Sequence, residues 1–257
     1  MLRVVFFDLG GTLAHPSPSF HGLLAEVCQA HGLDVTAEAA QRAEPAVWAK
    51  IAEREHEARG FSLTPERSRS FWIWVYQTFL HELAREPRDG VVEALLQRFS
   101  SPGAYELYED ALPALESLHQ SGLQLGIISN WEAWAEDMLD VLGIRRFFNC
   151  AVISGVSGFE KPEPEIFLRA LEVAGVGAAE ALHVGDDPLR DVEAAQRVGI
   201  AAVLLDRSGD SRVVPPAAFD PRRVSEGRTN ATPGQVQARQ IRSLRELPAL
   251  LAHEHPR

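Results

Sequence analysis

The stretch that decides the fold is "RVVFFDLGGTL" (residues 3–13), in which an apolar run ends on Asp8 and two glycines follow. A continuous apolar run, as opposed to an alternating one, is typical of a strand that is covered on both faces. Such a strand places the residue after it at the edge of a sheet. We therefore expect Asp8 to present its carboxylate to a ligand.

Further apolar runs of strand length occur at residues 123–129, 150–154, 181–185 and 201–205. Helical patterns lie at residues 110–122, 131–143, 164–175 and 191–199. Strands that alternate with helices predict an α/β fold, here a Rossmann-like parallel sheet with helices on both faces. Residues 239–251 predict a short strand and a closing helix.

The segment from His15 to Gly103 breaks this alternation, because its pattern is helical throughout. Thr64 and Pro65 suit the N-cap and the first turn of one of its helices. Since the segment follows the first strand directly, we interpret residues 15–103 as an all-helical module inserted into a core of residues 1–14 and 104–257. Residues 207–238 are rich in proline, glycine and charge and predict a long loop.

Composition restricts the class of protein. The 257 residues carry a net charge of −11, which argues against a nucleic-acid partner and against an anionic membrane surface. Cys28 and Cys150 are the only cysteines, so no disulfide framework is expected and a reducing compartment fits best. No apolar run has the length of a signal-peptide core or a membrane span. We expect a soluble, cytoplasmic protein.

Polar residues also follow the other predicted strands, at the edge where open parallel sheets bind ligands. They are Ser129, Asn130, Lys161, Asp186, Asp187 and, one helical turn later, Asp191. A helix expected to start near Trp131 would point its amide groups at the same place. Carboxylates, a lysine, a hydroxyl and a helix N-terminus together are typical of a site for magnesium and phosphate.

Four motifs in a fixed order resemble those of the haloacid dehalogenase superfamily of hydrolases. They are "FDLGGTL" (7–13), "IISN" (127–130), "EKPEPEIF" (160–167) and "HVGDDPLRD" (183–191). Each motif alone is weak, but the ordered set at four strand ends is specific. The resemblance covers residues 1–14 and about 104–206, and the helical insert lies where that family places its cap.

The resemblance implies a hydrolase acting on a small phosphorylated metabolite. Asp8 would be the catalytic nucleophile and would form an aspartyl-phosphate that water then cleaves. Ser129 and the amide of Asn130 would bind the phosphate oxygens. Lys161 would bind them too and would act in catalysis, by offsetting negative charge in the transition state.

The resemblance also implies a Mg²⁺ cofactor. Asp8, the backbone carbonyl of Gly10, Asp186 and Asp187 would hold the ion, and Asp191 would support this shell. Besides the phosphorylated small molecule, no nucleic-acid or membrane partner is expected. The oligomeric state and the identity of the substrate stay open.

Gly10 departs from the pattern of the family's phosphatases, which usually carry an aspartate two residues after the nucleophile. That side chain protonates the leaving group, a contribution of about 10²–10⁴-fold in rate. One interpretation is a substrate whose leaving group needs no proton, such as an acyl phosphate. Another is that His15, a short way downstream, supplies the proton. If Gly10 marks the missing acid, Gly10→Asp should raise turnover of alkyl phosphates more than of aryl phosphates.

Two other functional classes stay open because of the same glycine. A dehalogenase-type or phosphonatase-type hydrolase also lacks the second aspartate, although the acid-rich "GDDPLRD" argues against a metal-free dehalogenase. A catalytically weak phosphate-binding relative is the non-enzymatic alternative.

In the insert, "FWIWVY" (71–76) is interpreted as cap core, with Trp72 or Trp74 as candidates to face the cleft, while Trp131 and Trp134 are expected in the core.

Overall fold

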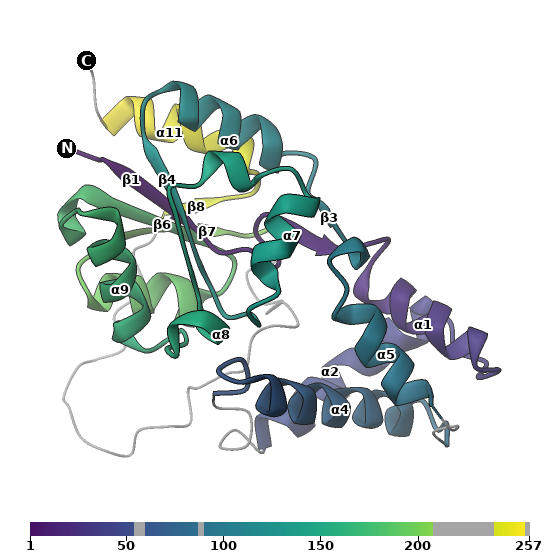
Figure 1. Ribbon diagram of the computed structural model, residues 1–257. Coiled ribbons are helices and arrows are strands. Elements are labelled where there is room, and N and C mark those ends of the chain that lie inside the picture. Colours follow the sequence, from purple (N-terminus) through teal and green to yellow (C-terminus); the bar gives the residue numbers. More distant parts are fainter. Residues whose placement is uncertain (54–59, 87–89, 208–238, 255–257) are drawn as a thin grey trace.

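The computed structural model describes residues 1–53, 60–86, 90–207 and 239–254, which form a sheet with flanking helices beside a group of further helices (Figure 1). In the described part of the chain the main sheet has six strands in the order β5-β4-β1-β6-β7-β8, and each neighbouring pair is parallel. The strands are β1 (Val4–Phe7), β4 (Gln124–Ser129), β5 (Cys150–Ile153), β6 (Ala181–Gly185), β7 (Ala201–Leu205) and β8 (Arg239–Ile241). The predicted α/β class and Rossmann-like sheet are confirmed.

Side chains of β1 alternate between two apolar layers, which explains why its sequence is apolar throughout. Val5 and Phe7 pack with α6 (Ala111–Gln120), α7 (Ala135–Val141) and α11 (Leu247–Glu254). Val4 and Phe6 pack on the opposite face with α9 (Pro164–Ala174) and α10 (Ala194–Arg197). All four side chains are fully buried, and each contributes roughly 1.5–3 kcal/mol to stability. The central strand is thereby a rigid support for the residue that follows it.

The cap consists of helices that pack around an apolar core of their own. They are α1 (Phe20–Ala30), α2 (Ala37–Glu53), α4 (Pro65–Glu82) and α5 (Val91–Phe99). Thr64 caps α4 as predicted, since its hydroxyl accepts a hydrogen bond from the amide of Arg67 at 3.3 Å, with Pro65 in the first turn. Figure 1 shows these helices set to one side of the sheet.

An antiparallel ribbon joins the core and the cap. It pairs β2 (Ala14–Pro16) with β3 (Tyr105–Leu107), so both chain connections between the sheet and the cap helices run through it. The ribbon lies close to the boundaries expected from the sequence, before residue 15 and after residue 103. Because β2 begins six residues after Asp8, the ribbon also places the cap over the end of β1.

Two helix starts differ from the sequence-based expectation. The helix expected near Trp131 begins only at Ala135, so residues 131–134 form a turn at the end of β4. The helix expected from residue 191 begins three residues earlier as a wider, π-type turn, η4 (Pro188–Glu193), and continues as α10. Both differences change which side chains reach the edge of the sheet.

Most of the segment predicted as a long loop, residues 208–238, lies outside the described residues. Among the described helices, we find none with the length and apolar character needed to cross a bilayer.

Candidate active site

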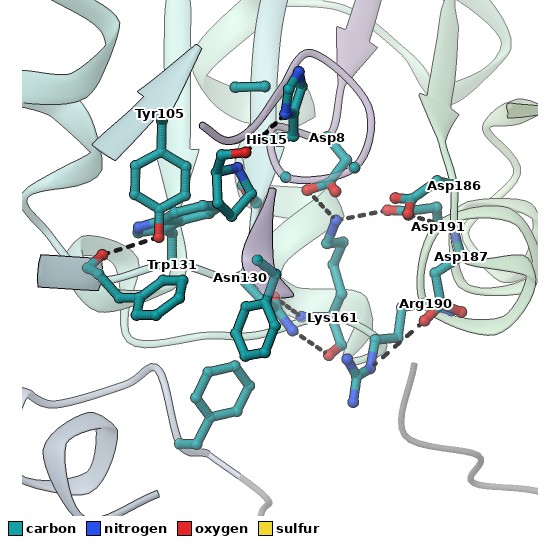
Figure 2. A pocket seen from close by; sticks show the side chains of 18 of the residues that line it. Asp8, His15, Tyr105, Asn130, Trp131, Lys161, Asp186, Asp187, Arg190 and Asp191 are labelled. Atoms are coloured by element: carbon teal, nitrogen blue, oxygen red, sulfur yellow. Dashed lines mark hydrogen bonds and ion pairs between the residues drawn. The ribbon is translucent and has the colours of Figure 1, made fainter. Parts of the chain in front are cut away.

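Asp8 and Lys161, predicted from separate strand ends, form an ion pair. Asp8 directly follows β1, and its amide donates to the carbonyl of Val184 in β6 at 2.9 Å. The Lys161 ammonium lies 2.7 Å from an Asp8 carboxylate oxygen and 2.6 Å from one of Asp191 (Figure 2). Lys161 is 4% exposed, so its charge is compensated by these two carboxylates in a dry environment.

Asn130 holds the backbone of Lys161 in place. Its side-chain amide donates to the Lys161 carbonyl at 2.8 Å and accepts from the Lys161 amide at 2.7 Å. The side chain of this predicted phosphate-binding residue therefore links the end of β4 to the loop that carries Lys161 (the lysine loop). Ser129, at the end of β4, is buried and lines the same cavity as Asp8.

Three carboxylates converge beside this lysine. Asp8, Asp186 and Asp191 each offer an oxygen, and these atoms lie within 4.8 Å of one another. The hydroxyl of Thr12, in the loop after β1, donates to Asp186 at 3.3 Å. When ionised, three acids beside one lysine carry an excess of negative charge that a cation would compensate, and carboxylate oxygens are the ligands that Mg²⁺ prefers. The donor set of this cluster fits a divalent cation.

The protonation of these groups follows from burial and from mutual charge. Burial raises the pKa of Asp186 well above its usual range, and the neighbouring carboxylate of Asp8 adds to this effect. Burial also raises the pKa of Asp8, although the Lys161 ammonium opposes it. For Asp191 burial is outweighed by Lys161 and by His183, whose Nε2 lies 2.9 Å away, so its pKa is held below its usual range.

Asp187, expected beside the metal, also caps a helical turn in this structure. One of its carboxylate oxygens accepts hydrogen bonds from the amides of Leu189 and Arg190, at 2.8 and 2.9 Å, and so caps η4. The structure groups Asp191 with Asp8 and Asp186. The sequence signal for Asp191 was its place one turn after the strand-end pair, which suggested only a supporting role.

The two glycines after Asp8 are required for different reasons. Gly11 has φ +76°, and a Cβ atom added there would lie 2.3 Å from the Asp186 carboxylate. A Cβ atom on Gly10 would lie 2.7 Å from Cζ3 of Trp131. The indole of Trp131 therefore occupies the space into which a side chain at position 10 would begin.

A cavity of about 590 Å³ opens from the carboxylates toward the cap. Many aromatic rings line it, in contrast to the charged end around Lys161 (Figure 2). The rings include Phe20, Trp48, Phe61, Trp72, Tyr105 and Trp131. Of the two candidates in the cap, the structure places Trp72 on this wall. Trp131 and Trp134, expected in the core, pack against it but also line the cavity, because the turn at residues 131–134 replaces the first turn of the expected helix.

Arg207 was missed by the sequence reasoning. Its guanidinium donates to the carbonyls of Gly11 and Thr12, at 3.2 and 2.7 Å, and pairs with Asp110 at 2.9 Å. It also stacks on the ring of Tyr108 at 3.7 Å from the centroid. Arg207 thus fixes the backbone after the nucleophile. It lies two residues after β7, so the strand-end rule that found the other site residues would have found it.

His15 is turned toward other protein groups. Its Nδ1 lies 2.9 Å from the carbonyl of Pro16, and its Nε2 lies 3.6 Å from a carboxylate oxygen of Glu106. The ring packs on Tyr108 with 4.4 Å between centroids. His15 also lines the cavity, but its two ring nitrogens face these protein groups.

Polar contacts tie the cap to the core beside the cavity. Glu160 accepts hydrogen bonds from the amide of Gly60 and from the hydroxyl of Ser62, the latter at 3.1 Å. Ser62 also bonds to Ser154 of the core at 2.7 Å, and Ser68 of α4 bonds to Glu132. Glu160 directly precedes Lys161, so the position of the cap is coupled to the lysine loop.

The family model of the haloacid dehalogenase-like hydrolases matches residues 2–199, which contain all of these side chains except Arg207. The chain belongs to this family. It is therefore a hydrolase, and its helical insert is the cap domain of a haloacid dehalogenase-like fold.

Named relatives and a solved structure agree with this assignment. The haloacid dehalogenase-like hydrolase domain-containing protein 3 of Bos taurus is 31% identical over 79% of this chain and 82% of its own length. The glyceraldehyde 3-phosphate phosphatase of Methanopyrus kandleri is 29% identical over 80% of this chain and 85% of its own. The putative hydrolase YfnB of Bacillus subtilis, solved with bound magnesium, has the same fold, with a TM-score of 0.71 at 19% identity over 97% and 98% of the two chains.

Proposed function

We propose that this haloacid dehalogenase-like hydrolase is a Mg²⁺-dependent phosphohydrolase acting on a small phosphorylated molecule. The observation that carries the proposal is the buried pair of Asp8 and Lys161 within a cluster of three carboxylates. A carboxylate beside a fixed cation, at the end of a rigid strand, is suited to attack phosphorus. The similarity to a phosphatase of Methanopyrus kandleri supports the same class of reaction.

In the proposed reaction a carboxylate oxygen of Asp8 attacks phosphorus, and the bond from phosphorus to the leaving oxygen breaks. Lys161, the hydroxyl of Ser129 and the amide of Asn130 bind the phosphoryl oxygens and offset their charge. Water then attacks the phosphorus of the aspartyl-phosphate, releasing inorganic phosphate and restoring the Asp8 carboxylate.

Asp8, Asp186 and Asp191 would hold Mg²⁺, with the carbonyl of Gly10 and the carboxylate of Asp187 as further proposed contributors. When bound, the ion would neutralise charge on the phosphoryl group. Thr12 orients Asp186, and Lys161 keeps Asp8 and Asp191 close together without repulsion. The side chains of the site are therefore held in this arrangement by one another, without a bound ion or substrate.

The direct test is phosphate release from an aryl phosphate, measured with and without Mg²⁺. We expect turnover that requires the ion and that falls at least about 10³-fold in Asp8→Asn, because the nucleophile is lost. Asp34→Asn is the control, since Asp34 has 95% of its side chain exposed and lies in the cap. Unchanged turnover in Asp8→Asn would show that the nucleophile is another group.

Gly10 supports a second candidate, a hydrolase that attacks carbon, as in a dehalogenase-type reaction. Reaction in ¹⁸O-labelled water separates the two. Attack on phosphorus puts the label into phosphate and leaves the Asp8 carboxylate unlabelled, because water attacks phosphorus in the second step. Attack on carbon makes an ester that water opens at its carbonyl, so the label would enter Asp8.

A further inference from the structure

The end of the cavity nearest Asp8 offers a leaving group no proton donor in the usual place. Position 10 has no side chain, and the indole of Trp131 fills the space where one would start. Titratable neighbours on the wall have protein partners. Glu132 accepts from the hydroxyl of Ser68, and Tyr105 donates its own hydroxyl to the carbonyl of Phe99 at 2.9 Å. His15 has its Nδ1 2.9 Å from the carbonyl of Pro16 and its ring packed on Tyr108. With no acid at position 10, a leaving oxygen would depart largely as an anion.

The remainder of the cavity favours an apolar, planar group. Its volume of about 590 Å³ is in the range of pockets that enclose a drug-sized ligand. Most of the charged residues lie around Lys161, with Glu132 beside the cap as an exception, and the aromatic rings of the lining come from both the core and the cap. A three-carbon polar metabolite would leave these rings without a partner.

Trp131 lies at the junction of the two ends. Its ring is fixed by edge contacts with Tyr105 and Trp134, at centroid distances of 5.2 and 5.7 Å. Because it also touches the space above Gly10, it lies where the group bonded to the phosphate oxygen must pass. Stacking of an aromatic ring on a fixed indole contributes binding energy without needing a hydrogen bond.

Resting on the proposed function, we infer that the substrate class is the phosphate monoester of an acidic aromatic alcohol, a phenol or a fused-ring equivalent, whose ring packs on Trp131. A phenol loses its proton near pH 10, far more readily than an alkyl alcohol, so a phenolate can leave without protonation. In balanced form, the oxygen of Asp8 bonds to phosphorus while the phosphorus–oxygen bond breaks and its electron pair stays on the phenolate oxygen, which takes a proton from water afterwards. Gly10 thus leaves the site without a general acid, and Trp131 favours a substrate with an aromatic ring.

Three phosphate esters separate the two parts of this inference when kcat/KM is measured with Mg²⁺. Phenyl phosphate has an aromatic ring and an acidic leaving group. Benzyl phosphate has an aromatic ring and an alkyl leaving group, and cyclohexyl phosphate has an alkyl leaving group without an aromatic ring. We expect kcat/KM for phenyl phosphate to exceed that for benzyl phosphate by about 100-fold or more, because an alkyl leaving group needs the general acid that this site lacks. We expect benzyl phosphate in turn to bind better than cyclohexyl phosphate.

Equal turnover of phenyl and benzyl phosphate would overturn the inference while leaving the phosphohydrolase intact. If none of the three esters, nor acetyl phosphate, releases phosphate, the proposed function itself fails. If Glu132→Gln lowers the rate for benzyl phosphate but not for phenyl phosphate, Glu132 is an acid for the leaving group and the inference is wrong.

Paired substitutions test the coupling of Gly10 and Trp131. Trp131→Ala should raise KM for phenyl phosphate about tenfold, and Trp131→Phe should raise it less. The sequence alone predicts that Gly10→Asp raises turnover of alkyl phosphates, but in the structure the new side chain meets the indole, so Gly10→Asp alone should give little gain on benzyl phosphate. Gly10→Asp with Trp131→Ala should raise that rate. Leu168→Ala, on the exposed side of α9, is the control and should change neither value. A full gain from Gly10→Asp alone would contradict the coupling.

Discussion

Lys161 is the residue on which the electrostatics of the site depend, because it lies between two buried carboxylates with a third nearby. Lys161→Met should destabilise the protein by about 3–5 kcal/mol, since it leaves uncompensated buried charge. It should also lower kcat about 10²–10³-fold, through loss of a donor to the phosphoryl oxygens. Urea unfolding and phosphate release measure the two effects.

Lys50→Met is the matched control for that substitution. Lys50 is half-exposed and pairs with Glu82 on the cap surface, so its removal should change stability by about 1 kcal/mol or less. Because Lys50→Met keeps the proposed cation site, added Mg²⁺ should stabilise this variant as much as the original protein. It should stabilise Lys161→Met by more, since the ion then also compensates the carboxylates that have lost the ammonium. No stabilisation of any of the three proteins by the ion would contradict a cation site beside Lys161.

At the residue scale, the predictable positions were those directly after a strand end. Asp8, Ser129, Asn130 and Asp186 each stand at the end of an apolar run, so their place at one edge of the sheet was evident from the sequence. The position of Trp131 was not, because it depends on α7 beginning at Ala135 and not four residues earlier. That shift exposes the indole to the cavity.

At the scale of elements, Asp110 joins three segments that are far apart in the sequence. Its carboxylate pairs with Arg207 after β7 and accepts hydrogen bonds from the hydroxyl of Ser243 and the amide of Leu244, at 2.7 and 2.9 Å. Burial alone would raise the pKa of Asp110, but these donors hold it below its usual range. The ionised form of Asp110 therefore stabilises the fold.

Asp110→Asn should destabilise the protein by about 2–3 kcal/mol at pH 7, because Arg207 loses its partner. A carboxyl whose pKa is lowered by folding contributes its stability above about pH 4 and loses it as the pH falls through the pKa of the folded state. The difference between the original protein and the variant should thus shrink below pH 4. Urea unfolding at several pH values measures it, with Asp34→Asn as the surface control. A difference that stays constant with pH would contradict the role of the Asp110 charge.

At the scale of the whole molecule, the cap is held over the site by a small polar contact. Ser62→Ala removes hydrogen bonds to Glu160 and Ser154. We expect KM for phenyl phosphate to rise about three- to tenfold, while kcat changes less, because each lost bond contributes about 0.5–1.5 kcal/mol. Ser70→Ala, on the exposed side of α4, is the matched control. A larger loss in kcat than in KM would place Ser62 in the chemical step instead.

The order of strands and helices along the chain made the overall architecture predictable, since an all-helical segment inserted between two strands of an alternating pattern can form a separate domain beside the sheet. The contacts that align the cap were not predictable from local pattern. Ser62 and Ser154 are 92 residues apart, and although Ser154 directly follows β5, no motif around Ser62 marks it as the partner. Such contacts depend on how the cap and the core pack against each other, which the spacing of apolar residues within one segment does not show.

The central claim is that Asp8 carries the phosphoryl group during turnover. Quenching the reaction with substrate and Mg²⁺ present, then reducing with borohydride, converts an aspartyl-phosphate into homoserine, which peptide mass spectrometry locates. We predict homoserine at position 8, formed only when both substrate and Mg²⁺ are present. An unmodified Asp8, or homoserine at another aspartate, would contradict the account.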